Sequence, residues 1–503
     1  MLNIGKSSVH RHLQAKEKRD QYSESHLWET EEGAEWIRLL FFAVLYKFGL
    51  EGGMGADRLS DFFKMIHLET HIGVSPSALR TQLSKIEVLL PQFQTLCEEN
   101  MGKSPRKSVL AMDETFFGNF MILVLMDLQS GYLLLEDLAE DRCFETWHKK
   151  VTPRLESLGI EVNHAISDRA KALIKLAITG FDCESGADVF HAQQDISRWL
   201  GSTIKRKTSI AKKEKDAVET TKEQQDSLSK EDDLAEEKAT ETQDTVILFQ
   251  KEYHANLRGV AEDIHPFELT TNEVKDSSQV EEALEQRIQN FETIAEALGI
   301  QDKKKTAQKF RNQIEALSST VDTWWFWVYE LLQELRIETE LSHWLTQMLL
   351  PVIYWHHQLN KTQNTATKKR YKAAWEQASD TLMRHPFTKK ISSDEMQRWV
   401  EWSGWMVKQF HRSSSAVEGR NGCLSQLYHN GRGLTEKRLQ ALTVIHNYGL
   451  KRKDGTTAAM RFFNSDFPDL FSWLLDEMGG LPLLRKARSR HIANPMILLD
   501  VPL

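Results

Sequence analysis

Two carboxylates in this sequence are spaced so that they can act on one substrate. Asp113 ends the predicted strand of residues 109–113, and Asp168 ends the predicted strand of residues 164–168. If these strands are neighbours that run in the same direction, both carboxylates lie at one edge of a sheet. There they can share two divalent cations, Mg²⁺ or Mn²⁺, which prefer oxygen ligands and suit phosphate chemistry.

A third carboxylate usually completes such a centre, and Glu418 is the predicted one. Its helix has an apolar face to dock on a sheet, and beside it a small polar face that DNA can approach closely. Glu376, Glu395 and Glu401 are alternatives from the preceding region, but Glu418 has cationic neighbours on both sides. The apolar face holds Val417, Leu424, Leu427 and Tyr428, and the polar face holds Glu418, Asn421, Gly422 and Ser425.

Other acidic and histidine side chains near the predicted strands are weaker candidates. Glu114 neighbours Asp113, but strand alternation points it to the opposite face. Asp127 and Asp188 sit near strand ends in positions that favour structural roles. His191 can contact a substrate or a metal, although a hydrogen-bonded core histidine is the favoured interpretation, as for His446.

The elements around these carboxylates predict an α+β core over residues 106–200. Three strands joined by short turns form an antiparallel meander, and a helix with buried Trp147 and an internal Pro153 follows. A fourth strand, a helix and a fifth strand complete the expected sheet. The predicted strands are residues 109–113, 120–126, 131–135, 164–168 and 189–191, and the predicted helices are residues 144–158, 169–178 and a helix from residue 195.

Residues 1–105 are predicted to be helical and to recognise DNA. Two segments have a helix-turn-helix character, one at residues 4–13 and one at residues 72–80. In the second, Ser75 is a cap and Pro76 the first helical residue. An ordinary pair of capped helices in a bundle is an equally supported interpretation. Arg11 and Arg80 are the predicted DNA contacts of this region.

A large helical insertion is expected between the two halves of the core. Residues 211–245 hold 6 Lys against 12 acidic residues and no aromatic residue, which predicts a solvated helix or a disordered linker. Residues 280–405 hold nine of the 14 tryptophans and predict an independent helical module with a mainly aromatic core. The insertion therefore covers residues 201–405. The core resumes at 406–465, and 466–503 form a C-terminal tail.

Composition excludes several classes of protein. The 503-residue chain has no run of about 18 apolar residues, so no membrane span is predicted. Its four cysteines form no CxxC pair, which argues against a disulfide framework and a zinc site. The cytoplasm or nucleoid is the expected location.

Basic residues are concentrated around the Glu418 helix. The net charge is −8, yet residues 403–461 hold 10 Lys and Arg against 3 acidic residues. A local positive field of this kind favours a phosphate-bearing partner. The predicted DNA contacts here are Arg412, Arg420, Arg432, Lys437 and Arg438.

Three short segments resemble the DDE transposases of insertion sequences. They contain Asp113 (residues 112–115), Asp168 (residues 167–173) and Glu418 (residues 417–422), and residues 434–439 and 454–459 are also similar to those proteins. The resemblance implies an RNase H-like fold: a mixed five-stranded sheet flanked by helices, interrupted by an all-α insertion and preceded by an N-terminal helical domain. The 250 residues between Asp168 and Glu418 exceed the gap in many relatives, some of which carry an insertion here.

The resemblance also implies a function. Asp113, Asp168 and Glu418 would be ligands of two metal ions that drive cleavage and strand transfer at transposon ends. The implied partners are double-stranded DNA, both terminal inverted repeats and target, and a second copy of the chain, in a bacterial cell. Two other functions stay open: a metal-dependent DNA nuclease on the same fold, and a non-enzymatic DNA-binding protein.

Overall fold

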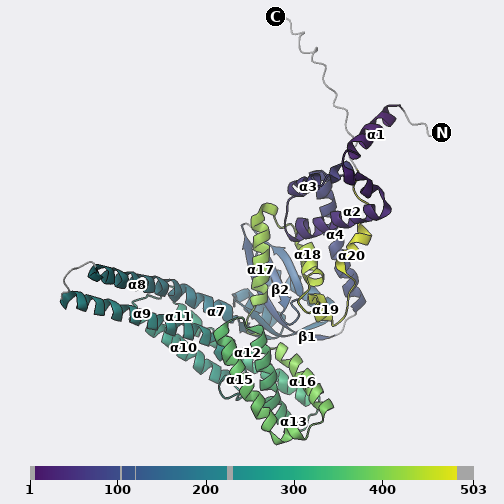
Figure 1. Ribbon diagram of the computed structural model, residues 1–503. Coiled ribbons are helices and arrows are strands. Elements are labelled where there is room, and N and C mark those ends of the chain that lie inside the picture. Colours follow the sequence, from purple (N-terminus) through teal and green to yellow (C-terminus); the bar gives the residue numbers. More distant parts are fainter. Residues whose placement is uncertain (1–5, 102–104, 119, 224–229, 484–503) are drawn as a thin grey trace. The chain divides into compact units, whose positions relative to one another are not determined.

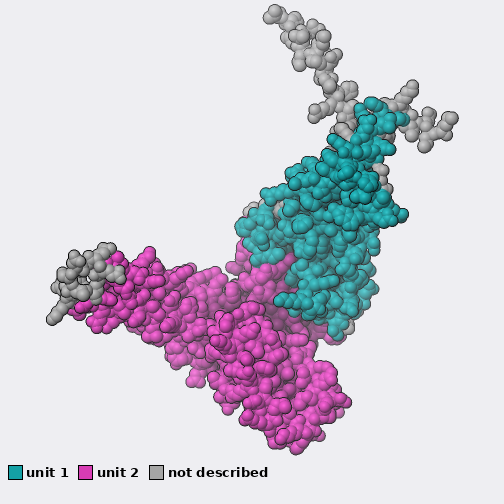
Figure 2. Space-filling model, in the orientation of Figure 1, with its two compact units in different colours: residues 1–102, 422–503 teal, residues 103–421 magenta. Residues whose placement is uncertain are grey.

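The structure is a computed structural model with two compact units (Figure 2). One unit holds residues 1–102 and 422–503, and the other holds residues 103–421. The N-terminal region therefore does not form a domain of its own, because the C-terminal part of the chain packs with it. The structure describes residues 6–101, 105–118, 120–223 and 230–483.

A mixed five-stranded sheet forms the centre of the 103–421 unit. Its order is β3-β2-β1-β4-β5. The first three strands are antiparallel neighbours, as the predicted meander requires, and β4 pairs in parallel with both β1 and β5. The predicted parallel pairing of β1 and β4 is confirmed. The prediction that Asp113 ends its strand is wrong, because pairing with β2 continues β1 for four more residues, to Phe117. The strands are β1 (Arg106–Phe117), β2 (Phe120–Asp127), β3 (Leu133–Ala139), β4 (Ile160–Ser167) and β5 (Glu184–Ala187).

The prediction of a fifth strand at residues 189–191 is wrong. The strand is β5, and α7 (Val189–Ile196) begins directly after it. Asp188 decides this boundary, because its side chain caps the helix by accepting a hydrogen bond from the Phe190 amide. His191 therefore lies in the first turn of a helix.

Helices cover the sheet next to β1. The helix predicted at residues 144–158 is confirmed as α5 (Phe144–Leu158), with Pro153 inside it. Its Trp147 indole donates to the Glu114 carboxylate at 3.3 Å, so Glu114 faces α5. The helix predicted at residues 169–178 begins and ends two residues later, as α6 (Lys171–Lys175) followed by the π-helical turn η4 (Leu176–Gly180).

The insertion is mainly helical in its described residues. The acidic segment forms α8 and α9, which run side by side as a long hairpin (Figure 1), so of the two alternatives the helix is observed. After α7 and the π-helical turn η5 (Ser197–Gly201), the helices are α8 (Ser202–Glu223), α9 (Lys230–Asp263), α10 (Ser277–Ala297), α11 (Thr306–Arg311), α12 (Ile314–Glu334), α13 (Thr339–Trp344), η6 (Leu345–Leu349), α14 (Leu350–Lys361), α15 (Thr365–Arg384), η7 (Pro386–Lys389) and α16 (Ser393–Lys408).

The tryptophan-rich part is not independent of the sheet. Helix α12 packs on β5, and Thr320 lies 3.4 Å from the buried His164 ring of β4. The absence of a side chain at Gly186 leaves room for the His164 ring, because a Cβ at this position would overlap the imidazole. The aromatic core is as predicted: Trp324, Trp325, Trp327, Trp344 and Trp355 are buried.

The other unit is all-helical in its described residues. Helix α4 is 26 residues long, begins at Pro76 and is capped by Ser75, as predicted. Residues 6–19 form one continuous helix, and the rest of the first predicted helix-turn-helix lies outside the described residues. The helices are α1 (Lys6–Arg19), η1 (Ser23–Glu29), α2 (Glu31–Val44), η2 (Leu45–Glu51), α3 (Ala56–Met65), η3 (Leu68–Thr70), α4 (Pro76–Met101), η8 (Tyr428–Arg432), α18 (Glu436–Val444), η9 (Ile445–Gly449), α19 (Ala458–Phe463) and α20 (Leu470–Met478).

The C-terminal region is more than a tail. Helices α18 and α20 both pack on α4, and the Lys85 ammonium of α4 donates to the Met478 carbonyl at 2.7 Å. Helix α17 (Ser415–Leu427) contains the boundary between the units. Among the described residues, no helix is long and apolar enough to cross a membrane.

Candidate active site

Asp113 lies in a row of side chains that crosses the sheet. It pairs with Val124 of β2, and Val124 pairs with Glu136 of β3. On the other side, the last pair of the β1–β4 register is Ala111 and Ile166. Two residues further along both segments, Asp113 lies opposite Asp168. Residues in one lateral row share a face. Asp113, Glu136 and Asp168 therefore belong to one face of the sheet, as the sequence predicts for the two aspartates.

Helix α17 lies on this face and is fastened to it by two contacts. The Arg420 guanidinium makes a two-pronged ion pair with Glu136, at 2.7 and 2.6 Å, and both groups are buried. The Asn421 amide donates to Asp113 Oδ2 at 2.6 Å. Glu418 lies three residues before Asn421, so it is about one helical turn from the residue that bonds to Asp113.

His191 reaches the same place from α7. Asp188 Oδ2 accepts hydrogen bonds from both the amide and the hydroxyl of Ser414, which ties the start of α7 to the start of α17. The His191 Nε2 atom lies 3.1 Å from Glu418 Oε1. The two groups are not aligned as a hydrogen bond, since Nε2 is buried with no hydrogen-bond partner among the described residues.

Three ligand atoms converge at this point. One atom each from Asp113, His191 and Glu418 lie within 4.8 Å of one another. Asp113 is only 9% exposed, and burial raises the pKa of its carboxyl group to about 7, with the negative charges of Glu418 and Asp168 acting in the same direction. The site is thus short of positive charge.

Asp168, the other predicted ligand, is not among the three residues whose ligand atoms converge, although its charge acts on Asp113. Its side chain is exposed, and Oδ1 accepts a 2.9 Å hydrogen bond from the Ala170 amide. The next residue, Arg169, has φ 64°, a left-handed conformation that costs a non-glycine residue about 1 kcal/mol. It is stabilised by its own hydrogen bonds to Ser167 and Ser185. Such local strain is typical of functional sites.

The residues present fit a divalent cation. Two carboxylates and an imidazole are a common donor set for Mn²⁺ and related ions, and carboxylates are the protein ligands that Mg²⁺ prefers. Two polar atoms at the cluster, His191 Nε2 and Asn421 Oδ1, are buried without a hydrogen-bond partner among the described residues. A cation with its bound waters would satisfy both atoms and offset the charge of Asp113 and Glu418.

Three of the arginines predicted to contact DNA have other contacts. Arg420 is paired with Glu136. Arg412 bonds to the carbonyls of Ala261 and Ile264, and the buried Arg438 bonds to the carbonyl of Gly49. These side chains stabilise the fold, and a phosphate contact by Arg420 or Arg438 would require these bonds to open.

The remaining predicted DNA contacts divide into two groups. Lys437 and Arg80 are exposed, and Arg80 forms an ion pair with Asp57 at 2.8 Å. The side chains of Arg11 and Arg432 lie outside the described part of the structure.

The sequence analysis underestimates the roles of His191 and Asn421 in the candidate site. It favours a core histidine at position 191, and it places Asn421 on the polar face of its helix without a partner. A signal for His191 is present: a capping Asp188 starts a helix and turns the following residues toward the end of the sheet. No local signal pairs Asn421 with Asp113.

Part of the chain matches a known family. Residues 345–490 match the model of a family described as "Family of unknown function (DUF6399)". This segment is less than a third of the chain; it runs from η6 to the C-terminal region and includes Glu418 and Asn421. No curated protein sequence matches the chain significantly.

Proposed function

We propose that this chain is a DDE-type transposase with an RNase H-like core that cuts transposon ends and joins them to target DNA. One observation carries the proposal: Asp113 within β1 and Asp168 directly after the parallel strand β4 share a lateral row, and Glu418 is fastened over that row from a helix about 250 residues later. The strand order β3-β2-β1-β4-β5 supports the proposed core.

Each residue has a distinct role in this proposal. Asp113 and Glu418 would hold one metal ion, Mg²⁺ or Mn²⁺, and Asp168 would contribute to holding a second. His191 orients the Glu418 carboxylate through their 3.1 Å contact. Bound divalent ions would supply a water molecule of lowered pKa and positive charge beside the phosphodiester. Two DNA ends must be held together, so the proposal includes a dimer or larger assembly on DNA.

The test is a cleavage and joining assay on DNA that carries the inverted repeats flanking the gene. Glu418→Gln keeps the size of the side chain and removes its charge, so metal-dependent cleavage should be abolished while DNA binding and folding persist. Glu401→Gln is the matched control, because Glu401 is an exposed carboxylate of α16, and it should cleave normally.

The products separate the alternatives. Joined DNA strands support a transposase, and cleavage without joining would identify a metal-dependent nuclease. Sequence-specific binding with no cleavage in Mg²⁺ or Mn²⁺ would identify a non-enzymatic DNA-binding protein. Normal cleavage by Glu418→Gln would refute the assignment of Glu418.

A further inference from the structure

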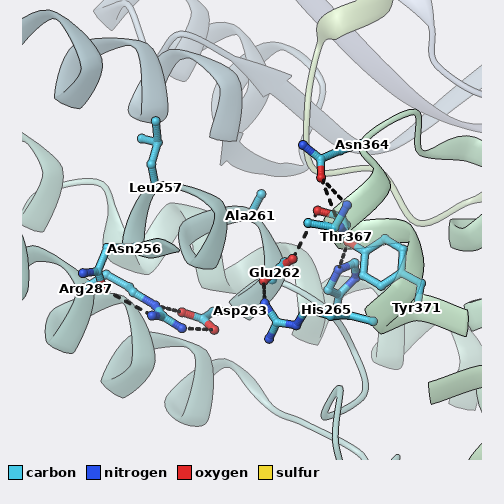
Figure 3. Close-up of polar contacts among 12 residues, drawn as sticks. Asn256, Leu257, Ala261, Glu262, Asp263, His265, Arg287, Asn364, Thr367 and Tyr371 are labelled. Atoms are coloured by element: carbon cyan, nitrogen blue, oxygen red, sulfur yellow. Dashed lines mark hydrogen bonds and ion pairs between the residues drawn. The ribbon is translucent and has the colours of Figure 1, made fainter. Parts of the chain in front are cut away.

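A cleft of about 370 Å³ opens beside the candidate active site, in the 103–421 unit. One wall is the end of α9 and another is the start of α15, and Figure 3 shows Glu262 of α9 and Thr367 of α15 facing one another there. Most of its remaining polar lining consists of hydroxyl and amide side chains, among them Gln193, Thr362 and Asn364. Its volume suits a ligand of nucleotide size.

Arg412 provides a positive charge in this cleft without an acidic partner at ion-pair distance among the described residues. Its guanidinium donates to the Ala261 and Ile264 carbonyls and contacts the His265 ring and the Tyr371 hydroxyl, all of them neutral groups. Burial lowers the pKa of His265 well below its usual value, and the charge of Arg412 adds to this effect. A half-buried cation with neutral partners favours an anion in the adjoining space.

The other charges of the lining strengthen this field. Arg258 and Lys361 are exposed at the cleft. The one acidic lining residue, Glu262, is already occupied, because it pairs with Arg370 and accepts a hydrogen bond from Thr367. The lining thus offers three cations, and its one carboxylate has a cation of its own.

We propose that this cleft binds a phosphate group, and that the group belongs to a DNA strand that also reaches Asp113 and Glu418. The second half of the inference rests on the proposed function. The cleft and the site share two segments: Val189 and Gln193 line the cleft from one face of α7, which carries His191 on another face, and Ser413 and Ser415 line the cleft just before Glu418.

These shared segments are bonded to each other. The Val189 amide donates to the Arg412 carbonyl at 3.1 Å, and Ser414 bonds to Asp188. A phosphate on Arg412 would therefore be held by the same backbone that positions His191 and Glu418. Such a contact would fix the register of the strand relative to the reacting bond without reading its sequence.

The first experiment uses inorganic phosphate as the probe and the full chain. Thermal unfolding is measured with phosphate replacing chloride at constant ionic strength. Phosphate should raise the Tm of the wild-type protein, since a ligand of the folded state stabilises it. The double variant Arg258→Gln/Lys361→Gln should lose that rise. The control Lys372→Gln/Arg384→Gln removes the same charge from exposed positions of α15 and should respond like the wild type. Equal responses by all three proteins would overturn the site.

The second experiment identifies the source of the phosphate. Binding to duplex DNA is measured without metal, where Arg258→Gln/Lys361→Gln should weaken affinity by about tenfold relative to the control. Loss of the phosphate response with unchanged DNA affinity would overturn a DNA strand as the ligand and leave a free phosphate compound. If the wild type responds to phosphate but never cleaves DNA, the proposed function fails and the phosphate site stands.

Discussion

The Asn421 amide donates a 2.6 Å hydrogen bond to Asp113 Oδ2 and so joins two residues 308 positions apart in the chain. This bond fixes the carboxylate in the orientation that faces Glu418 and His191. Residues that orient metal ligands typically affect metal affinity or activity by about 10–100-fold.

We therefore expect Asn421→Ala to lower metal-dependent cleavage by about 10–100-fold and to raise the metal concentration needed for half-maximal activity. Gln426→Ala, at an exposed position of the same helix, is the control and should behave as the wild type. A metal titration of the cleavage rate measures both effects. Wild-type metal dependence in Asn421→Ala would show that the hydrogen bond is not needed to position Asp113.

Asp113 should destabilise the metal-free protein at neutral and alkaline pH. The pKa of its carboxyl group in the folded state, about 7, lies above the ordinary value of 3.8. A raised folded pKa means that stability is lost as pH rises from about 4 through 7. Asp113→Asn should therefore increase the free energy of unfolding at pH 8 by a few kcal/mol, on the order of 1.4 kcal/mol per pKa unit at most.

At pH 4 the same substitution should have little effect. Urea unfolding in the presence of a chelator measures the difference, with Asp168→Asn as the exposed control. Added Mn²⁺ should stabilise the wild type more than Asp113→Asn. A variant less stable than the wild type at pH 8 would contradict this account of the site.

The His164 ring should make the protein sensitive to acid. Burial lowers the pKa of His164 to about 4 from 6.5, so the unfolded chain takes up a proton that the folded chain resists. Stability is then lost as pH falls from about 6.5 to 4, by about 1.4 kcal/mol per pH unit for this group. His164→Gln should reduce the slope of unfolding free energy against pH in this range. Urea titrations at several pH values test this, and an unchanged slope would assign the acid sensitivity to other buried groups such as His265 and His411.

DNA binding should depend on salt through exposed cations of the 422–503 segment. Lys451, Arg452 and Lys453 are exposed, whereas Arg420 and Arg438 are buried. Changing all three exposed residues to Gln should reduce the slope of log affinity against log salt by about 1 for each phosphate that the variant no longer neutralises.

The matched control changes Arg384, Lys389 and Lys390 to Gln, which removes the same charge from exposed positions of the insertion. Its slope should equal that of the wild type. Equal slopes for both triple variants would place the phosphate-binding residues elsewhere in the chain.

Local patterns in the sequence are sufficient for most of the elements and for placing two aspartates on adjacent parallel strands. Apolar runs mark β1, β2 and β4, and the aspartates of one row are Asp113 within β1 and Asp168 directly after β4. Helical spacing locates α5 at residues 144–158, and alternation correctly places Glu114 on the face opposite Asp113. Each of these inferences depends on residues within a few positions of one another, where periodicity and capping act.

The tertiary structure alone decided which distant groups meet. Arg420 pairs with Glu136, 284 positions away, because docking of α17 removes both charges from water and each then requires the other. The same docking allows the Asn421 amide to donate a hydrogen bond to Asp113. The helix that Asp188 caps places His191 beside Glu418. The N-terminal and C-terminal helices also pack together, because α18 and α20 cover α4. Removal of residues 1–105 would therefore expose the apolar faces of α18 and α20. A sequence pattern indicates which side chains can be buried. Which groups they contact depends on the packing of segments that are far apart in the sequence.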